Sequence, residues 1–117
     1  MIGILLMERL KTVTPNVYPV SSPQQGPVPY ITITLIASIS DYTHEGYSGL
    51  EQTTYRINIY SDSFTETKTI ATAVEESLNT WKDGPVSNAM KTAHVENREN
   101  ETSYNLTTLS YIIRWKN

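Results

Sequence analysis

The hydrophobic pattern changes its period from two residues to about 3.6 residues between positions 31 and 81, and this change constrains the fold most. Apolar side chains occupy alternate positions from Ile31 to Ile39, and a second alternation follows over residues 53–60. The apolar positions of the two runs are Ile31, Ile33, Leu35, Ala37, Ile39, Tyr55, Ile57 and Ile59. We therefore predict two neighbouring strands, each with one apolar face.

The stretch Ser40–Glu51 between these strands is polar, contains glycine and is longer than a tight turn requires. We predict an antiparallel pair whose loop projects beyond the sheet.

A helix follows the second strand. Ser63 is placed to cap its N-terminus, and Glu66 completes a capping box three residues later. The apolar stripe consists of Ile70, Val74, Leu78 and Trp81. Since Asp83-Gly84-Pro85 stops the pattern, we predict a helix of roughly 17 residues with one buried face.

The flanking regions supply the remaining elements. Residues 2–12 predict a short amphipathic helix that ends at Thr14-Pro15, and the proline-rich residues 15–29 predict an extended, stiff connection. Two further strands are expected at about 89–97 and 103–115, joined by a turn. The last strand has apolar residues on both faces, so the sequence does not decide which face points to the core. One face carries Leu109, Tyr111, Ile113 and Trp115, and the other carries Leu106 and Ile112.

The expected fold is therefore α+β, in the order α-β-β-α-β-β, with a four-stranded antiparallel sheet and helices packed on one face. A chain of 117 residues fits a single domain, residues 1–117. A formal charge of −3 with interspersed signs argues against nucleic-acid binding. No apolar run approaches the ~20 residues of a membrane span.

Candidate chemistry is sparse. With no cysteine, thiolate metal sites and disulfides are excluded. A metal ion could use Asp41, His44 and Glu45, but a solvated loop is the favoured interpretation because the other histidine, His94, lies on a predicted strand. The adjacent Glu75 and Glu76 point about 100° apart on a helix and cannot act as a carboxylate pair. We expect no enzyme activity and no cofactor; a metal-dependent enzyme built on residues 41–45 and a generic ligand-binding module remain as alternatives.

Three blocks resemble the bacteriophage tail-completion family, also called tail terminators or tail-to-head joining proteins. The first is Val17-Tyr18-Pro19 with Pro23-Gln24-Gln25 and Pro27-Val28-Pro29-Tyr30-Ile31. The second is Gly46-Tyr47-Ser48-Gly49-Leu50 before the strand Tyr55–Ser61. The third is the helix, with Glu66, Lys68, Ala71, Ala73, Val74 and Leu78 in the family's order. Together they cover about residues 17–81.

The resemblance implies a structural virion protein that caps the phage tail tube as a ring, expected to be six-fold, and joins the tail to the head. The implied partners are the tail tube protein, the head connector or stopper proteins, and further copies of the chain; nucleic-acid specificity and membrane binding are not implied. Its place would be the head-proximal end of the tail, after assembly in the cytoplasm of the host bacterium. The alternative role within virion assembly is a neck or head-closure connector on the portal side.

A ring subunit needs surfaces for its neighbours and for the tube. We predict that the loop Asp41–Leu50 is a mobile element that orders on meeting the tube, since tyrosines give large contact area and its glycines permit rearrangement. The candidate partner-binding residues are Asp41, Tyr42, His44, Glu45, Tyr47 and Leu50. The alternative is an ordinary hairpin loop whose glycines serve turns.

Overall fold

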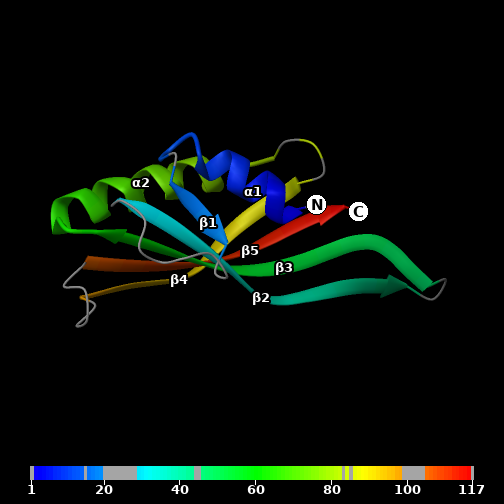
Figure 1. Ribbon diagram of the computed structural model, residues 1–117. Helices are drawn as coiled ribbons and strands as arrows, with labels where there is room; N and C mark the ends of the chain where they lie inside the picture. The colour runs from blue at the N-terminus through cyan, green and yellow to red at the C-terminus, as the bar shows by residue number, and fades with distance from the viewer. Residues whose placement is uncertain are drawn as a thin grey trace.

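The computed structural model describes residues 2–14, 16–19, 29–43, 46–82, 84, 86–98 and 105–116. Its elements are α1 (Ile2–Leu10), β1 (Val17–Pro19), β2 (Tyr30–Thr43), β3 (Gly46–Ser61), α2 (Phe64–Asn79), β4 (Val86–Arg98) and β5 (Asn105–Lys116). The strands form one five-stranded sheet in the order β1-β2-β3-β5-β4, and both helices lie on the same face of it (Figure 1). The α+β class and the one-sided helices agree with the sequence prediction. Within the described residues, no helix is long and apolar enough to cross a membrane.

The predicted four-stranded antiparallel sheet is wrong by one strand. β1 lies in the proline-rich stretch that we expected to be a connection, and it pairs in parallel with β2, with Val17 opposite Ile31 and Pro19 opposite Ile33. Proline lacks the N–H that an inner strand must donate, so it is tolerated here because β1 is an edge strand. The rest of the stretch, residues 20–28, lies outside the described residues.

The core lies between the helices and the sheet. Ile57 of β3 lies opposite Ile33 of β2 and opposite Leu109 of β5, which makes a row of aliphatic residues across the sheet. The helices cover this face with one stripe each: Ile2, Leu6 and Leu10 from α1, and Ile70, Val74 and Leu78 from α2. Arg9 links the two helices, since its Nε donates to the Ser77 carbonyl at 2.9 Å and its guanidinium lies 5.3 Å from the Trp81 ring centroid. Both predicted helices are confirmed. The predicted stripe of α2 is confirmed as far as Leu78; Trp81 is buried as well, but it lies beyond the end of α2 at Asn79.

The facing of the last strand is settled by burial. Thr107, Leu109, Tyr111 and Ile113 are buried, whereas Leu106 and Ile112 are half-buried on the opposite face. Because β5 inserts between β3 and β4, its inward residues contribute to the centre of the core.

The start of α2 is held by a closed set of hydrogen bonds. The Glu66 N–H donates to the Ser63 hydroxyl at 3.3 Å, as expected for an N-cap. The Ser63 N–H does not reach the Glu66 carboxylate directly; it donates to Ser61 Oγ at 3.1 Å, and the Ser61 hydroxyl donates to that carboxylate. The predicted capping box is therefore relayed through Ser61, a fully buried residue.

A β-bulge in β2 changes which side chains reach the core. Leu35 lies opposite Tyr55, but Ala37 lies opposite Thr54, so Ile36 is an extra residue in the ladder. The alternation that predicted one apolar face from Ile31 to Ile39 therefore holds only as far as the bulge, and β2 is exposed from Leu35 to Ile39.

The predicted loop over Ser40–Glu51 is mostly strand. β2 continues to Thr43 and β3 begins at Gly46, with Ser40 opposite Glu51 and Tyr42 opposite Tyr47. The sequence shows no alternation here because no helix covers either face of these strands (Figure 1), so neither face has to be apolar.

Candidate interaction surfaces

The outer part of the β2–β3 hairpin, residues 35–43 and 46–53, is called the arm below. The molecule measures 52 × 24 × 22 Å along its principal axes, and the arm projects past the helices at one end of the long axis (Figure 1). A hairpin that leaves the core in this way cannot be stabilised by core packing along its whole length. The arm is therefore the leading candidate for contacts with other molecules.

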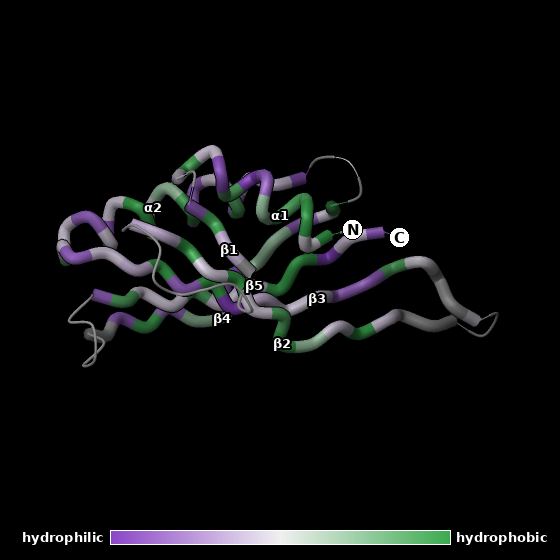
Figure 2. The backbone as a smooth tube through the Cα atoms, viewed as in Figure 1, coloured by the Kyte–Doolittle hydropathy of each residue, from purple (hydrophilic) through white to green (hydrophobic). Residues whose placement is uncertain are grey.

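Large apolar side chains are exposed on the arm. The exposed fractions are 56% for Leu35, 47% for Ile36, 60% for Ile39 and 44% for Leu50. Apolar segments recur along this hairpin beyond the helices (Figure 2). Exposed apolar side chains that cluster on one segment are typical of surfaces that bind another protein.

The six residues predicted to bind partners all belong to the arm or its tip. The backbone places Tyr42 opposite Tyr47, and Leu50 lies at the arm's base opposite Lys116. His44 and Glu45 fall outside the described residues, as do the side chains of Asp41, Tyr42 and Tyr47. Their role in binding stays a prediction.

Gly46 and Gly49 have positive backbone φ angles of 110° and 87°. Glycine adopts such angles without steric cost, whereas other residues are strained there. A Cβ added at Gly46 would meet no atom within 4 Å, so backbone conformation and not crowding favours glycine at this position. Both glycines thus have a structural reason to be present in a hairpin.

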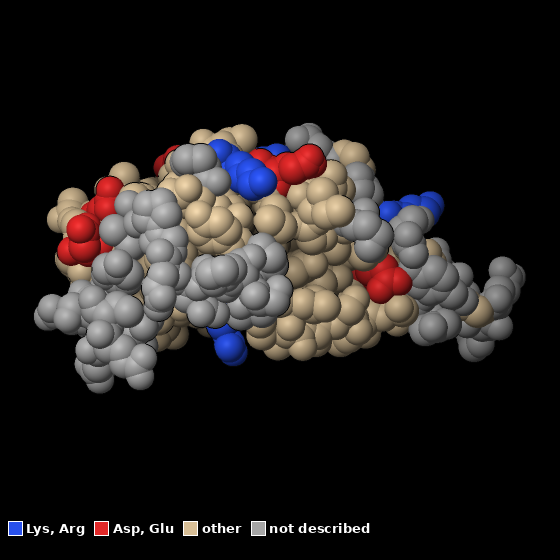
Figure 3. Space-filling view, viewed as in Figure 1, with Lys and Arg blue, Asp and Glu red and all other residues tan. Residues whose placement is uncertain are grey.

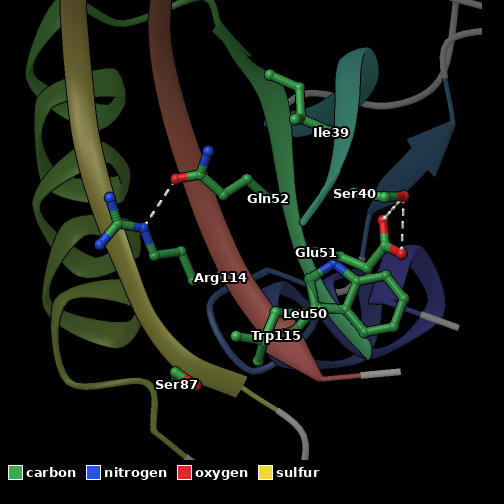
Figure 4. A pocket seen from close by; sticks show the side chains of 8 residues that line it. All are labelled: Ile39, Ser40, Leu50, Glu51, Gln52, Ser87, Arg114 and Trp115. Atoms are coloured by element: carbon green, nitrogen blue, oxygen red, sulfur yellow. Dashed lines mark hydrogen bonds between the residues drawn. The ribbon is translucent and has the colours of Figure 1, made fainter. Parts of the chain in front are cut away.

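A groove of about 360 Å³ lies at the base of the arm (Figure 4). Its polar side chains are paired with one another: Ser40 Oγ donates to the Glu51 carboxylate at 3.0 and 3.1 Å, and Arg114 Nε donates to Gln52 Oε1 at 2.9 Å. The apolar part of the lining comes from Ile39, Leu50 and Trp115. Because these polar groups bond to one another, the groove suits an apolar side chain better than a charged ligand.

A larger hollow of about 550 Å³ separates α1 from the arm and is called the α1–arm groove below. Its walls are almost entirely apolar or aromatic; they include Ile2, Ile4 and Met7 from α1, and Leu35, Tyr55 and Trp115 from the sheet. Ile4 stands at its edge with 59% of its surface exposed. Burial raises the pKa of the Tyr55 hydroxyl, which keeps that group neutral in the groove wall.

The opposite edge of the sheet is protected. On β4, His94 Nε2 lies 3.0 Å from Glu96 and its Nδ1 lies 3.6 Å from Glu75 of α2, which also pairs with Lys91. The register of β4 against β5 shifts twice, at Ser87 and at Thr92. Charged side chains and bulges on an edge strand discourage pairing with another sheet, so β4 is a poor site for strand addition.

The same Glu75 affects a core residue. Burial, and then the negative charge of Glu75, raise the pKa of Tyr111 to about 12. The Tyr111 hydroxyl donates to Asn79 Oδ1 at 3.3 Å, so the neutral phenol has a partner on α2.

In the part of the chain that the structure describes, no group of three His, Cys, Asp or Glu side chains could hold a metal ion. The metal-binding alternative at Asp41, His44 and Glu45 lies outside that part. His94, predicted to be a half-exposed strand residue, has a side chain that is 32% exposed, as expected.

The exposed apolar residues of the arm and the exposed Phe64 at the start of α2 were not predicted from the sequence. One feature of the sequence indicated that the strand alternation is interrupted in the arm. Ile36 is an apolar residue at an otherwise polar position of the alternation Thr32, Thr34, Ile36, Ser38, and the bulge lies there.

Comparison with known proteins identifies the family. The profile of the family described as tail completion protein gp17 matches residues 7–113. Among curated proteins, none matches the chain. A solved structure titled "Virion of native gene transfer agent (GTA) particle" contains a similar chain, with a TM-score of 0.56 and 16% identity over 97% of this chain and 85% of that one. At that identity the likeness concerns the fold alone. Because the family profile spans most of its length, the chain belongs to the tail completion protein gp17 family and is a phage tail structural protein.

Proposed function

We propose that this protein caps the finished tail tube as a ring, expected to be six-fold, and joins the tail to the head. It would act at the head-proximal end of the tail, with the tail tube protein on one side and the head connector or stopper proteins on the other. The observation that carries the proposal is the arm, an uncovered hairpin with exposed apolar side chains, in a chain that belongs to a tail-completion family.

The arm suits contact with a partner for a physical reason. Leu35, Ile36 and Ile39 gain little from folding because they stay exposed, so their burial against another protein is a gain that the isolated chain lacks. Tyr42 and Tyr47 lie opposite each other near the tip, where two aromatic side chains would offer contact area at low entropic cost. We assign the tube contact to this part of the arm, with Asp41, His44, Glu45 and Leu50 as its remaining members.

The proposed role needs no reaction and no cofactor. A ring forms when each subunit carries two different complementary surfaces and the rotation between copies closes. Joining the tail to the head then depends on which surfaces the ring presents at its two ends.

The test is electron microscopy of tails made with and without the protein in its own phage. We expect tails of abnormal length, or normal tails that are not attached to filled heads, when the protein is absent. Normal infectious virions would overturn the proposal. Tubes and portals immobilised separately then decide the side of action: binding to portals instead of tubes would favour the head-closure alternative.

A deletion of residues 43–48 tests the arm itself. The segment lies between Tyr42 of β2 and Gly49 of β3, at the end of the hairpin away from the strands that the helices cover. We expect the variant to unfold at the same urea concentration as the parent and to fail to complete tails. If the deletion variant completes tails normally, the tip is not the tube contact. Stoichiometric metal in protein purified without chelator would instead revive the metal-dependent alternative.

A further inference from the structure

An exposed aromatic side chain marks the end of the molecule opposite to the arm. Phe64, the single phenylalanine of the chain, begins α2 with 55% of its surface exposed. α2 begins at the end of the long axis away from the arm (Figure 1). Lys68 lies one turn later, with its Nζ 5.2 Å from the ring centroid, so the ring is oriented by a neighbour on its own helix. The core cluster does not include this ring.

The α1–arm groove lies at the other end and has the chemistry that a phenyl ring prefers. Trp115 and Tyr55 offer aromatic contacts, and Met7 offers a polarisable thioether. The groove's edges, Ile4 and Leu35, are each more than half exposed. An apolar side chain entering the groove would cover both edges at once.

The charges at the two ends of the molecule differ. Asp62 is exposed two residues before Phe64 and Glu66 follows it, while Lys68 lies over the Phe64 ring. At the groove end, Arg114 and Lys116 are exposed and project from the face of β5 opposite to that of Trp115, Arg114 donates to Gln52, and the nearby Glu51 accepts from the Ser40 hydroxyl. Acidic side chains gather over the start of α2, and a basic side chain projects at the end where the arm leaves the helices (Figure 3). Two copies placed end to end would bring opposite charges together.

We propose that Phe64 of one copy inserts into the α1–arm groove of the next copy, so that copies join head to tail. The contact uses two different surfaces at opposite ends of one molecule, which is the arrangement that a closed ring requires. Strand pairing through β4 is one competing way to join copies, and the bulges and charges of β4 act against it. The inference rests on the proposed ring and names the surfaces that would close it.

The absence of cysteine allows a direct test by cross-linking. Thr65 is exposed beside Phe64 on α2, so a cysteine there leaves the ring in place. A Thr65→Cys, Leu35→Cys double variant would be assembled on tails and treated with a short bifunctional thiol reagent. We expect a ladder of covalent oligomers that ends at the ring number. The matched control is Thr65→Cys, Val95→Cys, because Val95 is 48% exposed, against 56% for Leu35, but lies on β4; it should give no ladder.

Point substitutions give an independent measurement. Phe64→Ser should leave the urea midpoint unchanged and lower the yield of rings at least tenfold, and Phe64→Tyr should restore most of it. Asp62→Lys and Lys116→Glu should each lower ring yield several-fold at low salt, and the two changes together should restore it. A merely structural role for these exposed residues would produce no such rescue.

The outcomes separate the two proposals. Rings that form normally with Phe64→Ser, or rings that give no ladder, would overturn the Phe64 contact and leave the ring function standing. If microscopy finds no ring either in solution or on tails, the proposed function fails and the contact fails with it. A ladder that ends at the ring number, together with charge rescue, supports both.

Discussion

Leu35 and Ile39 are four positions apart on β2, yet they project to opposite faces of the sheet, because Leu35 pairs with Tyr55 and Ile39 pairs with Gln52. In an uninterrupted strand, the side chains of Leu35 and Ile39 would project to the same face. The extra residue Ile36 shifts the alternation by one position, so the Ile39 side chain projects to the other face. The bulge therefore gives the arm apolar side chains on both of its faces.

The first prediction concerns the separation of the arm from the core. Ile39→Thr should change the free energy of unfolding by less than about 0.5 kcal/mol, because the side chain is exposed. The control Ile57→Ala removes a fully buried side chain and should cost about 2–5 kcal/mol. Urea unfolding followed by circular dichroism measures both. A cost for Ile39→Thr as large as for the control would show that the arm packs against the core.

The second prediction concerns Gly3 in α1. A Cβ at this position would lie 3.0 Å from the Tyr55 hydroxyl oxygen, while the next atom, Tyr55 Cζ, lies at 3.9 Å. Alanine in place of glycine stabilises a helix by roughly 1 kcal/mol when nothing opposes it. Gly3→Ala should therefore be more favourable in a Tyr55→Phe background than in the parent, by at least about 0.5 kcal/mol. A double-mutant cycle of unfolding free energies measures the difference; equal effects in both backgrounds would show that the hydroxyl does not crowd this position.

The third prediction concerns the relay at the start of α2. Ser61→Ala removes the hydroxyl that accepts from the Ser63 N–H and donates to Glu66. Because Ser61 is fully buried, the loss should cost about 1–3 kcal/mol of stability. Ser63→Ala, which removes the cap's acceptor alone, should cost about 1 kcal/mol. Thermal and urea unfolding should rank Ser61→Ala as the more damaging change, and the reverse order would argue against the relay.

The fourth prediction is a pH dependence from Tyr111. Its pKa is raised from 10.0 to about 12 in the folded protein, so the unfolded chain loses this proton first as the pH rises. The stabilising contribution is complete below about pH 10 and is lost between about pH 10 and pH 12, amounting to roughly 2–3 kcal/mol. Tyr111→Phe should remove this part of the alkaline destabilisation. Urea unfolding of both proteins between pH 8 and pH 11.5 gives the difference, and parallel curves would contradict the assignment.

The sequence predicted the elements whose signals are local. α2 has its cap, its stripe and its stop within one segment, so its position follows without knowledge of its neighbours. Alternation likewise located β2 and β3, because one face of each meets the core before the bulge. The facing of β5 needed the three-dimensional structure, since apolar residues occur on both of its faces.

Other features depend on neighbours and were not predictable in this way. Val17 and Tyr18 form a strand because they pair with the edge of β2. The surrounding prolines make this strand hard to predict from the sequence. No helix covers the outer part of the arm, residues 40–51, so this part carries no alternation and resembled a loop in the sequence. The candidate partner residues near the tip were chosen for their chemistry, and their side chains at positions 41, 42, 44, 45 and 47 lie outside the described part of the chain.

The position of β5 between β3 and β4 has a consequence for synthesis. Ile57 of β3 pairs with Leu109, so the middle of the sheet joins residues that are far apart along the chain. β5 follows every other element, and until the ribosome has released it, β3 and β4 have no strand to join them. Pairing of this long range is slow to form. Folding of the sheet should therefore follow translation of β5 instead of accompanying the growth of the chain, and a nascent protein stalled before residue 105 should be sensitive to protease throughout its strands.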